Sequence, residues 1–411
     1  MKKLFLICLL CSILFSLAKA QQLEYFITRG LMNNPMLNEY NNNVRTSATD
    51  SLLVAATNKP QVNSNSQILY APSYKSFGYD EAVTNGGNYS SVVDVSQYIF
   101  NRRDLKNRYE SINLQKQKWQ NGAKISAADI RKVITNLYLT TYADYNEVTN
   151  SSSYLTLMNQ HKEILKQLVQ QGIYRQSDYL SLVIEVQTAE IDLSKIQTQF
   201  IKDVYLLRQI CGISDTTKFA LEMPALVTTL PVNPGDSPLF KQYKLDSLRI
   251  INERQSFDIR YVPKISWFSD AGIMSSDPAR LYKNVGYSLG LNMSFPIFDG
   301  HQRKLDRQKF SIQENTRSSY ENYFKIQYSS QVKQLNAELY STRQTLDMLN
   351  TQLSTTKELV SLLKSQMNEG NVSIIELIGT MKNYISVNRT ACQLQMREFE
   401  IINELNYLMQ Q

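Results

Sequence analysis

The sequence has little of the chemistry on which enzymes and metal sites depend. It contains four cysteines and two histidines, and two of the cysteines lie in the apolar N-terminal segment. His161 and His301 lie far apart in the sequence, and no cluster of Cys, His or carboxylate residues at metal-ligand spacing accompanies either of them. No nucleophile, base and orienting group recur together. We therefore expect neither an enzyme nor a bound cofactor or metal.

Proline is missing from two long tracts, 74–223 and 297–411, although the chain has ten prolines. Proline inside a helix removes a backbone hydrogen bond and costs about 3 kcal/mol, so these tracts predict long helices. Glycine is also scarce there, since Gly122 is the only internal glycine of residues 102–171 and 300–369. A helix of about 70 residues is ~105 Å long, so it must lie against other helices along its length.

The only long apolar run, Leu4–Leu17, lies at the N-terminus behind Lys2 and Lys3. It is followed by Ala18-Lys19-Ala20, an A-x-A cleavage site, so residues 1–20 are predicted to be a secretory signal peptide. Beyond this segment no apolar run approaches the ~20 residues of a transmembrane helix. Any membrane-spanning part would therefore have to consist of strands.

The charge balance is mild. The formal net charge is +7, and removal of the three lysines of the signal peptide, which contains no acid, leaves +4. This excess is too small to indicate nucleic acid binding. Two basic clusters open the predicted long helices: Arg102, Arg103 and Lys106, and Arg303, Lys304 and Arg307. They fit either a rim that faces phospholipid headgroups or a solvated first helical turn.

The chain is built as two repeats. The matched pairs at an offset of 198 are residues 96–101 with 294–299 and Gly172 with Gly370, and those at an offset of 203 are Pro35 with Pro238 and Pro60 with Pro263. The difference between the offsets predicts an unequal loop between two strands. We divide the mature chain into a first repeat (21–223) that opens with a helix from Leu23 to about Thr57, a Pro-rich linker (224–238) and a second repeat (239–411).

Each repeat is predicted to carry a β-hairpin. In residues 285–295, apolar and small polar residues alternate, which puts an apolar row and a polar row on opposite faces of a strand. We expect strands near Gln67–Phe77 and Tyr89–Phe100 in the first repeat, and near Arg260–Ile273 and Asn284–Pro296 in the second. A strand of ~10 residues is long enough to cross an outer membrane within a barrel. A soluble hairpin with aromatic packing is the alternative.

Two stretches, Leu31-Met-Asn-Asn-Pro-Met-Leu37 and Phe295-Pro-Ile-Phe-Asp-Gly300, resemble the TolC family of outer-membrane efflux ducts. With the order of elements in both repeats, the resemblance covers essentially all of residues 23–411. It implies a mainly α fold with membrane β, in which each protomer has four long helical regions and two β-hairpins. It further implies a homotrimer whose 12-stranded β-barrel is continued by a periplasmic α-barrel.

Four strands from one chain cannot close a barrel, and in lipid each unpaired backbone group costs several kcal/mol. A barrel needs at least about 8 strands, which either a dimer or a trimer would supply. The resemblance favours the trimer.

The resemblance also implies an outer-membrane location with a long periplasmic extension, and a passive exit duct for efflux or secretion rather than an enzyme. Its implied partners are a periplasmic adaptor, an inner-membrane transporter that supplies the energy, and outer-membrane lipid, with no nucleic acid. A structural coiled-coil stalk or surface adhesin without transport is the alternative. That alternative explains the signal peptide and the helices but not the two hairpins.

Two helical turns, residues 171–178 and 369–376, are the candidate functional sites. In each, a glycine permits positive φ, a serine caps the returning helix and an acid follows in its first turn. By resemblance these turns are the tips that dock the adaptor, through Gly172, Arg175, Ser177, Asp178, Gly370, Ser373 and Glu376. The resemblance also makes Glu376 the candidate for a pore constriction, although Gly379 stands where some relatives carry a second acid. Asp94, on the polar face of its strand, is the candidate for a residue that faces the lumen.

The remaining cysteines and histidines are expected to be structural. Cys211 matches Met409 at the offset of 198, on the apolar seam of the return helix, so we expect it in the core. If the two return helices run side by side, Cys392 lies ~28 Å from Cys211 along the helix axis, too far for a disulfide. His161 lies on an apolar stripe and matches a leucine in the second repeat, which favours a packed histidine over a ligand.

Overall fold

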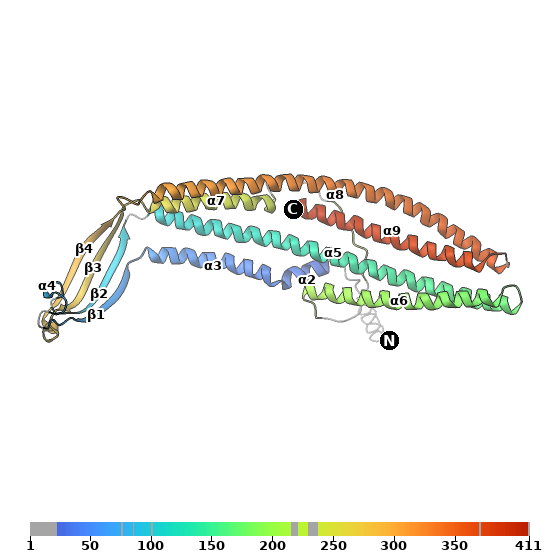
Figure 1. The fold of residues 1–411 in the computed structure, drawn as a ribbon, viewed down its shortest axis with the longest axis horizontal. Coiled ribbons are helices and arrows are strands. Elements are labelled where there is room, and N and C mark those ends of the chain that lie inside the picture. The colour runs from blue at the N-terminus through green and yellow to red at the C-terminus, as the bar shows by residue number, and fades with distance from the viewer. Residues whose placement is uncertain are drawn as a thin grey trace, which may run out of the picture. The chain divides into compact units, whose positions relative to one another are not determined.

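The computed structural model describes residues 23–409 except 75–76, 85, 100–101, 215–220, 229–236 and 370. Its elements follow in the order α2 (Leu23–Asn33), α3 (Pro35–Thr57), β1 (Gln61–Tyr70), α4 (Glu81–Thr84), β2 (Gly87–Ile99), α5 (Arg102–Gln170), α6 (Gln176–Cys211), α7 (Pro238–Ile259), β3 (Lys264–Ser275), η2 (Pro278–Lys283), β4 (Val285–Ser294), α8 (Gln302–Asn368) and α9 (Ile374–Met409) (Figure 1). The predicted signal peptide lies outside the described residues. Among the residues described, no helix is both long and apolar enough to cross a membrane.

The contacts of the chain divide it into two compact units, and each unit combines parts of both predicted repeats. The first unit contains Met1–Asn38, Ala123–Pro238 and Tyr323–Gln411, and the second contains Glu39–Gly122 and Leu239–Asn322. The long helices α5 and α8 contribute to both units because their ranges cross these boundaries.

The first unit is held together by apolar clusters between helices. The cluster shared by the ends of α5, α6, α8 and α9 contains Met158, Leu165, Leu168, Leu182, Val186, Leu363, Met367, Val372, Ile374, Leu377 and Met381. A second cluster joins α2, α5 and α6 and contains Phe26, Ile27, Ile134, Tyr138, Leu207, Cys211 and Leu221. Burial of one large apolar side chain contributes about 1.5–3 kcal/mol, so these clusters stabilise the helical hairpins against each other.

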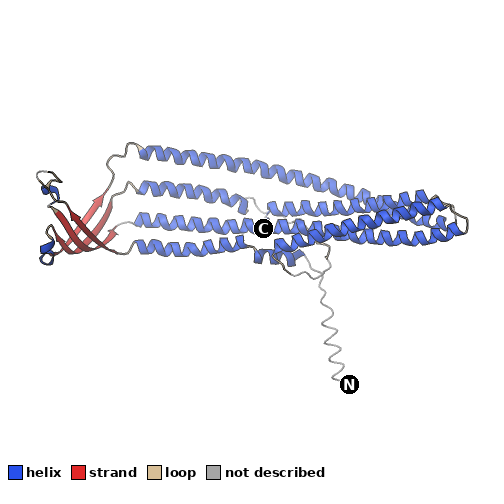
Figure 2. Cartoon of the chain, turned by 60° about the horizontal axis from the view of Figure 1, so that its bottom comes forward, coloured by secondary structure: helices blue, strands red, loops and turns tan. Residues whose placement is uncertain are grey.

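The second unit contains a four-stranded antiparallel sheet with the order β1-β2-β3-β4 (Figure 2). The pairing of β2 with β3 joins the hairpin of the first half of the chain to the hairpin of the second half. The strands β1 and β4 are the two edges of the sheet. Both edge strands therefore present backbone groups that this sheet does not pair.

The two faces of the sheet differ in chemistry. Residues that lie directly opposite each other share a face, and the register places Ile99 opposite Ile265 and Trp267 opposite Leu291. This apolar face continues along β4 through Tyr287 and Leu289, which are 87% and 76% exposed. The other face is polar and carries Asn63, Asn65, Gln67, Asp94, Asp270, Ser288 and Asn292.

The two offsets seen in the sequence also separate the elements of the structure. The offset of 198 relates α6 to α9, both at their first residues, Gln176 and Ile374, and at their last. The same offset relates the start of β2 to the start of β4, whereas the offset of 203 relates the start of β1 to that of β3. The difference therefore arises between the start of β1 and the start of β2, a segment that includes α4.

The first strand prediction was wrong in position. β1 spans Gln61–Tyr70, whereas the sequence favoured Gln67–Phe77. The polar run Gln61–Gln67 has weak strand propensity, but it pairs with β2 from Gln61 opposite Ser96 onward, and tertiary pairing overrides propensity. The other three strands lie within a few residues of their predicted ranges.

The predicted helix Leu23–Thr57 is two helices, because the chain breaks at Asn34. The residue before a proline is disfavoured in helical conformation, and Pro35 follows Asn34. The Asn34 side-chain oxygen accepts a hydrogen bond of 2.9 Å from the backbone N–H of Met36. Asn34 therefore ends α2 and supports the first turn of α3, in which Pro35 takes the favoured first position.

Candidate functional site

The turn between α5 and α6 is closed by a glycine in left-handed conformation. Gly172 has φ 78°, and its N–H donates to the carbonyl of Val169 at 3.0 Å, while the N–H of Ile173 donates to the carbonyl of Leu168 at 3.0 Å. This pair of hydrogen bonds is a Schellman motif, which satisfies carbonyl groups at the end of a helix. A Cβ added at Gly172 would meet nothing within 4 Å, so only the backbone conformation requires glycine here.

The side chain that stabilises the start of α6 is that of Asp178, not that of Ser177. The helix starts after Arg175, which has extended backbone angles, and the Asp178 carboxylate accepts a hydrogen bond of 3.1 Å from the N–H of Arg175. This is the reciprocal half of a capping box, and the acid also suits the positive end of the helix dipole. The predicted cap Ser177 is instead the second helical residue, because the helix begins two residues earlier than a serine cap would allow.

The turn between α8 and α9 has the same hydrogen bond at its equivalent position. Gly370 itself lies outside the described residues. The N–H of Asn371 donates to the carbonyl of Gln366 at 3.1 Å, and this bond matches the one from Ile173 at the offset of 198. The Asn371 N–H thus satisfies a carbonyl near the end of α8, as the Ile173 N–H does near the end of α5.

Helix α9 begins directly after Ser373, which places this serine at the predicted cap position. The Ser373 carbonyl accepts a hydrogen bond of 3.1 Å from the N–H of Leu377. Glu376 is the third residue of α9, as Asp178 is the third residue of α6. Both Glu376 and the nearby Gly379 are exposed. The two acids thus take equivalent positions in the two turns.

A tyrosine that the sequence analysis missed connects the two turns. The hydroxyl of Tyr174 donates a hydrogen bond of 3.0 Å to the backbone carbonyl of Val372. Burial raises the pKa of Tyr174, so the hydroxyl keeps its proton as a donor. Tyr174 and Val372 are related by the offset of 198 and so occupy equivalent positions of the repeats. The contact between Tyr174 and Val372 could have been found from the repeat, because the repeat brings equivalent loops to the same end of the helices.

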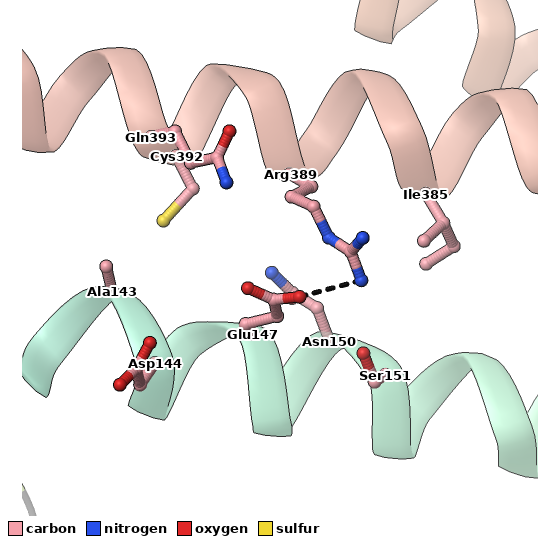
Figure 3. Close-up of a pocket in the computed structure, with 9 residues that line it drawn as sticks. All are labelled: Ala143, Asp144, Glu147, Asn150, Ser151, Ile385, Arg389, Cys392 and Gln393. Atoms are coloured by element: carbon pink, nitrogen blue, oxygen red, sulfur yellow. Dashed lines mark ion pairs between the residues drawn. The ribbon is translucent and has the colours of Figure 1, made fainter. Parts of the chain in front are cut away.

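Ion pairs link α9 to both α5 and α6. Lys382 lies 2.6 Å from Glu185 of α6, and Arg389 lies 2.7 Å from Glu147 of α5 (Figure 3). The carboxylate side chains are mostly buried, with 13% of Glu185 and 26% of Glu147 exposed. Ion pairs of buried carboxylates are screened less by salt than those of surface groups, so these pairs fix α9 beside α5 and α6.

Beside the pair of Arg389 and Glu147, a small pocket between α5 and α9 contains Asp144 (Figure 3). The Oδ2 atom of Asp144 is buried and has no hydrogen-bond partner in the described part of the chain. Burial, followed by the neighbouring carboxyl of Asp203 on α6, raises the pKa of Asp144 to about 8. Asp144 therefore holds a proton at neutral pH.

The predicted lumen candidate Asp94 has a partner that the sequence analysis missed. Asp94 on β2 lies directly opposite Asp270 on β3, on the polar face of the sheet. Neighbouring strands supply donors, since the side-chain amides of Asn63 and Asn65 donate to Asp94 and the hydroxyl of Ser288 donates to Asp270. Like charges directly opposite each other repel, so these donors offset part of an unfavourable pairing.

Cys211 and His161 are buried, and Cys392 is half-buried. Cys211 is fully buried in an apolar cluster, and both Cys211 and Cys392 are free thiols. His161 is 1% exposed, and burial followed by the nearby Lys364 lowers its pKa, so the ring is neutral at pH 7. Among the residues described, no group of three His, Cys, Asp or Glu side chains could hold a metal ion.

No protein-family model and no curated protein sequence matches the chain. Solved structures do match. CusC, a protein that forms a transmembrane channel, aligns with a TM-score of 0.77 at 14% identity, with 95% of this chain and 92% of CusC covered. The outer membrane protein VceC from Vibrio cholerae aligns with a TM-score of 0.77 at 11% identity, with 94% and 95% covered. The MtrE outer membrane channel of Neisseria gonorrhoeae aligns with a TM-score of 0.75 at 14% identity, with 94% and 88% covered.

Likeness at these identities shows the fold. The chain has the fold of the TolC-family outer-membrane channels, mainly helical with two β-hairpins, as the sequence resemblance predicted.

Proposed function

From the shared fold we propose that this chain is an outer-membrane channel, a passive exit duct for efflux or secretion. The observation that carries the proposal is the sheet with one exposed apolar face and one polar face. An exposed apolar row is unfavourable in water, since each large side chain gains about 1.5–3 kcal/mol when it leaves water. In a barrel wall the apolar face contacts lipid, and the polar face, with Asp94, lines a water-filled lumen.

The edges of the sheet support a homotrimer. In lipid, unpaired backbone groups on β1 and β4 would each cost several kcal/mol. Pairing of β1 of one protomer with β4 of the next removes both edges. Three copies of the four-stranded sheet then close a 12-stranded barrel, which the long helices continue as a periplasmic α-barrel.

Two structural repeats, 21–223 and 239–411, joined by the linker 224–238, each supply one helical turn at the far end of the periplasmic part. We assign the adaptor to these turns, through Gly172, Arg175, Ser177, Asp178, Gly370, Ser373 and Glu376. The exposed side chains of Arg175 and Ser177 suit such a docking surface. A duct lined by polar groups does no work, so the energy comes from an inner-membrane transporter coupled through the adaptor.

Glu376 is the proposed constriction residue. Three equivalent carboxylates, one from each protomer, would attract cations and oppose anions at the closed end of the duct. The exposed side chain of Glu376 supports this role, because it is free to face a pore.

The proposal is tested by expression of the full chain in a Gram-negative host. We expect heat-modifiable trimers in the outer-membrane fraction, and discrete conductance steps when the purified protein is added to planar lipid bilayers. A water-soluble monomer would contradict the proposal. Outer-membrane trimers without conductance would instead favour a structural stalk or adhesin. Cross-linking through cysteines placed at residues 175 and 177, followed by pull-down, tests the adaptor.

A further inference from the structure

A pocket of about 440 Å³ lies in the second unit, where β2 gives way to α5 and α7 gives way to β3. Its lining has two kinds of chemistry. One part is apolar and includes Ile99, Val262 and Ile265, while the other part is cationic and includes Arg102, Arg103 and Lys264. Such a lining fits a ligand that has an anionic group next to an apolar chain.

The cationic part of the pocket is not neutralised from within. Asp104, which also lines the pocket, pairs with Arg108 at 2.8 Å. In the part of the chain that the structure describes, no acid forms an ion pair with Arg102, Arg103 or Lys264. Three positive charges therefore line the pocket, and none of them has a counter-ion among the described residues.

In the second repeat, by contrast, an acidic side chain neutralises the basic cluster at the start of α8. There the side chains of Arg303 and Arg307 lie 3.2 Å and 2.7 Å from the carboxylate of Asp258 on α7. At the offset of 203, the residue of α3 that corresponds to Asp258 is Ala55. The first repeat thus lacks the acid that balances the basic cluster of the second repeat, and its arginines remain available to an external anion.

The apolar part of the pocket is continuous with the apolar face of the sheet. Ile99 and Ile265 lie directly opposite each other at one end of the β2–β3 pairing, on the face that also carries Trp267 and Leu291. An alkyl chain that lies along this face would therefore reach the pocket without leaving apolar surface.

We propose that this pocket binds an anionic phospholipid, with the phosphate at Arg102, Arg103 and Lys264 and an acyl chain against Ile99 and Ile265. The guanidinium group of arginine presents paired N–H donors that match phosphate oxygens. This inference rests on the proposed membrane function, and it names the lipid that the junction of strands and helices holds. The lipid belongs to the leaflet on the side of the helices.

The test uses the purified full-length protein in detergent, with phosphatidylglycerol as the probe and phosphatidylcholine for comparison, measured by native mass spectrometry. The wild type retains phosphatidylglycerol in preference to phosphatidylcholine. The double variant R102Q/R103Q binds phosphatidylglycerol roughly tenfold more weakly, because two charges that face the phosphate are gone. The double variant K309Q/K333Q, which removes two exposed lysines of α8 without a described ion pair, is the matched control and binds like the wild type.

Several outcomes would overturn the lipid site. These are unchanged binding by R102Q/R103Q, an equal loss in the lysine control, or displacement of the lipid by millimolar inorganic phosphate, which would indicate a site for free phosphate. Trimer formation and conductance are measured on the same samples, and both variants should retain them. A conducting trimer without selective lipid binding rejects the lipid site alone, whereas a soluble wild type that binds no phospholipid rejects the channel as well.

Discussion

The side chains of Asn107 in α5 and Asn252 in α7 exchange hydrogen bonds with each other's backbone. The Asn107 amide donates to the Asn252 carbonyl at 3.0 Å, and the Asn252 amide donates to the Asn107 carbonyl at 3.1 Å. Both residues are buried, with 6% and 5% exposed. This reciprocal pair joins α5 to α7 through buried polar groups.

Replacement of Asn107 by alanine should destabilise the protein by about 1–3 kcal/mol, because the buried backbone carbonyl of Asn252 loses the hydrogen bond from the Asn107 amide. The measurement is the midpoint of thermal or denaturant unfolding. N107A and N252A each remove a different one of the two hydrogen bonds. The double variant N107A/N252A should still lose less than the sum of the two single variants, since both bonds belong to one contact between α5 and α7 and loss of one loosens the other. Asn315, exposed on α8, provides the control, and N315A should change stability by less than about 0.5 kcal/mol. Additive losses from N107A and N252A would show that the two side chains act independently.

Replacement of Tyr174 by phenylalanine should loosen the second turn while the helices remain folded. It removes only the hydroxyl that donates to Val372, a loss of about 0.5–1.5 kcal/mol. Amide hydrogen exchange should accelerate in residues 371–377 and stay unchanged in the middle of α9. Tyr179, which packs against the same cluster, gives a control in Y179F. Equal exchange in Y174F and wild type would refute the connection.

Stability should fall as pH rises toward about 8, because of Asp144. Its folded pKa is raised, so the stabilisation is fully present below the ordinary carboxyl pKa and is lost as pH rises through the folded pKa. The variant D144N, which cannot ionise, should unfold at a more constant temperature between pH 6 and pH 9 than the wild type. D192N serves as the control, because Asp192 is exposed and pairs with the neighbouring Lys195. The assignment fails if D144N retains the pH dependence of the wild type.

Replacement of Gly172 by valine should cost about 1–2 kcal/mol, because a β-branched residue has to adopt φ 78°. Open space around the site means that no collision adds to this cost. We expect trimers to form but cross-linking to the adaptor to be lost. Gly379 offers the contrast, since it lies inside α9 with equally open surroundings, and G379A should stabilise the helix by up to about 1 kcal/mol. Normal adaptor cross-linking by G172V would exclude the first turn from docking.

Replacement of Glu376 by alanine should raise single-channel conductance or reduce cation selectivity in planar bilayers, because it removes the proposed ring of charge. D178A, at the equivalent position of the first turn, distinguishes a pore role from a general effect of lost acids. An E376A channel that conducts like the wild type would remove Glu376 from the gate.

The sequence predicted the long helices well, because these rest on local signals. Proline-free tracts and apolar periodicity act within one helix, so the lengths of α5, α6, α8 and α9 could be read without knowledge of their neighbours. The position of β1 could not be read from the sequence, since the polar residues from Gln61 onward become a strand only through pairing with β2.

The candidate sites also contain features that local sequence determines and features that depend on contacts between distant segments. The turn at Gly172 follows from local chemistry, and the structure confirms its positive φ. The contacts of Tyr174 with Val372 and of Asp144 with Asp203 each join two separate loops or helices. Such contacts depend on how helices align side by side, which a single sequence does not specify.

The unequal offsets of the two halves bear on how proteins of this design can change during evolution. One residue inserted into α6 would rotate everything after it by ~100° and shift it by ~1.5 Å, so it would disturb contacts along the rest of the helix. A residue inserted beside α4 disturbs no helix, because the adjoining strands keep their own pairing. Insertions and deletions should therefore accumulate in the loops of the β-hairpins, while the paired long helices keep the same length in both halves.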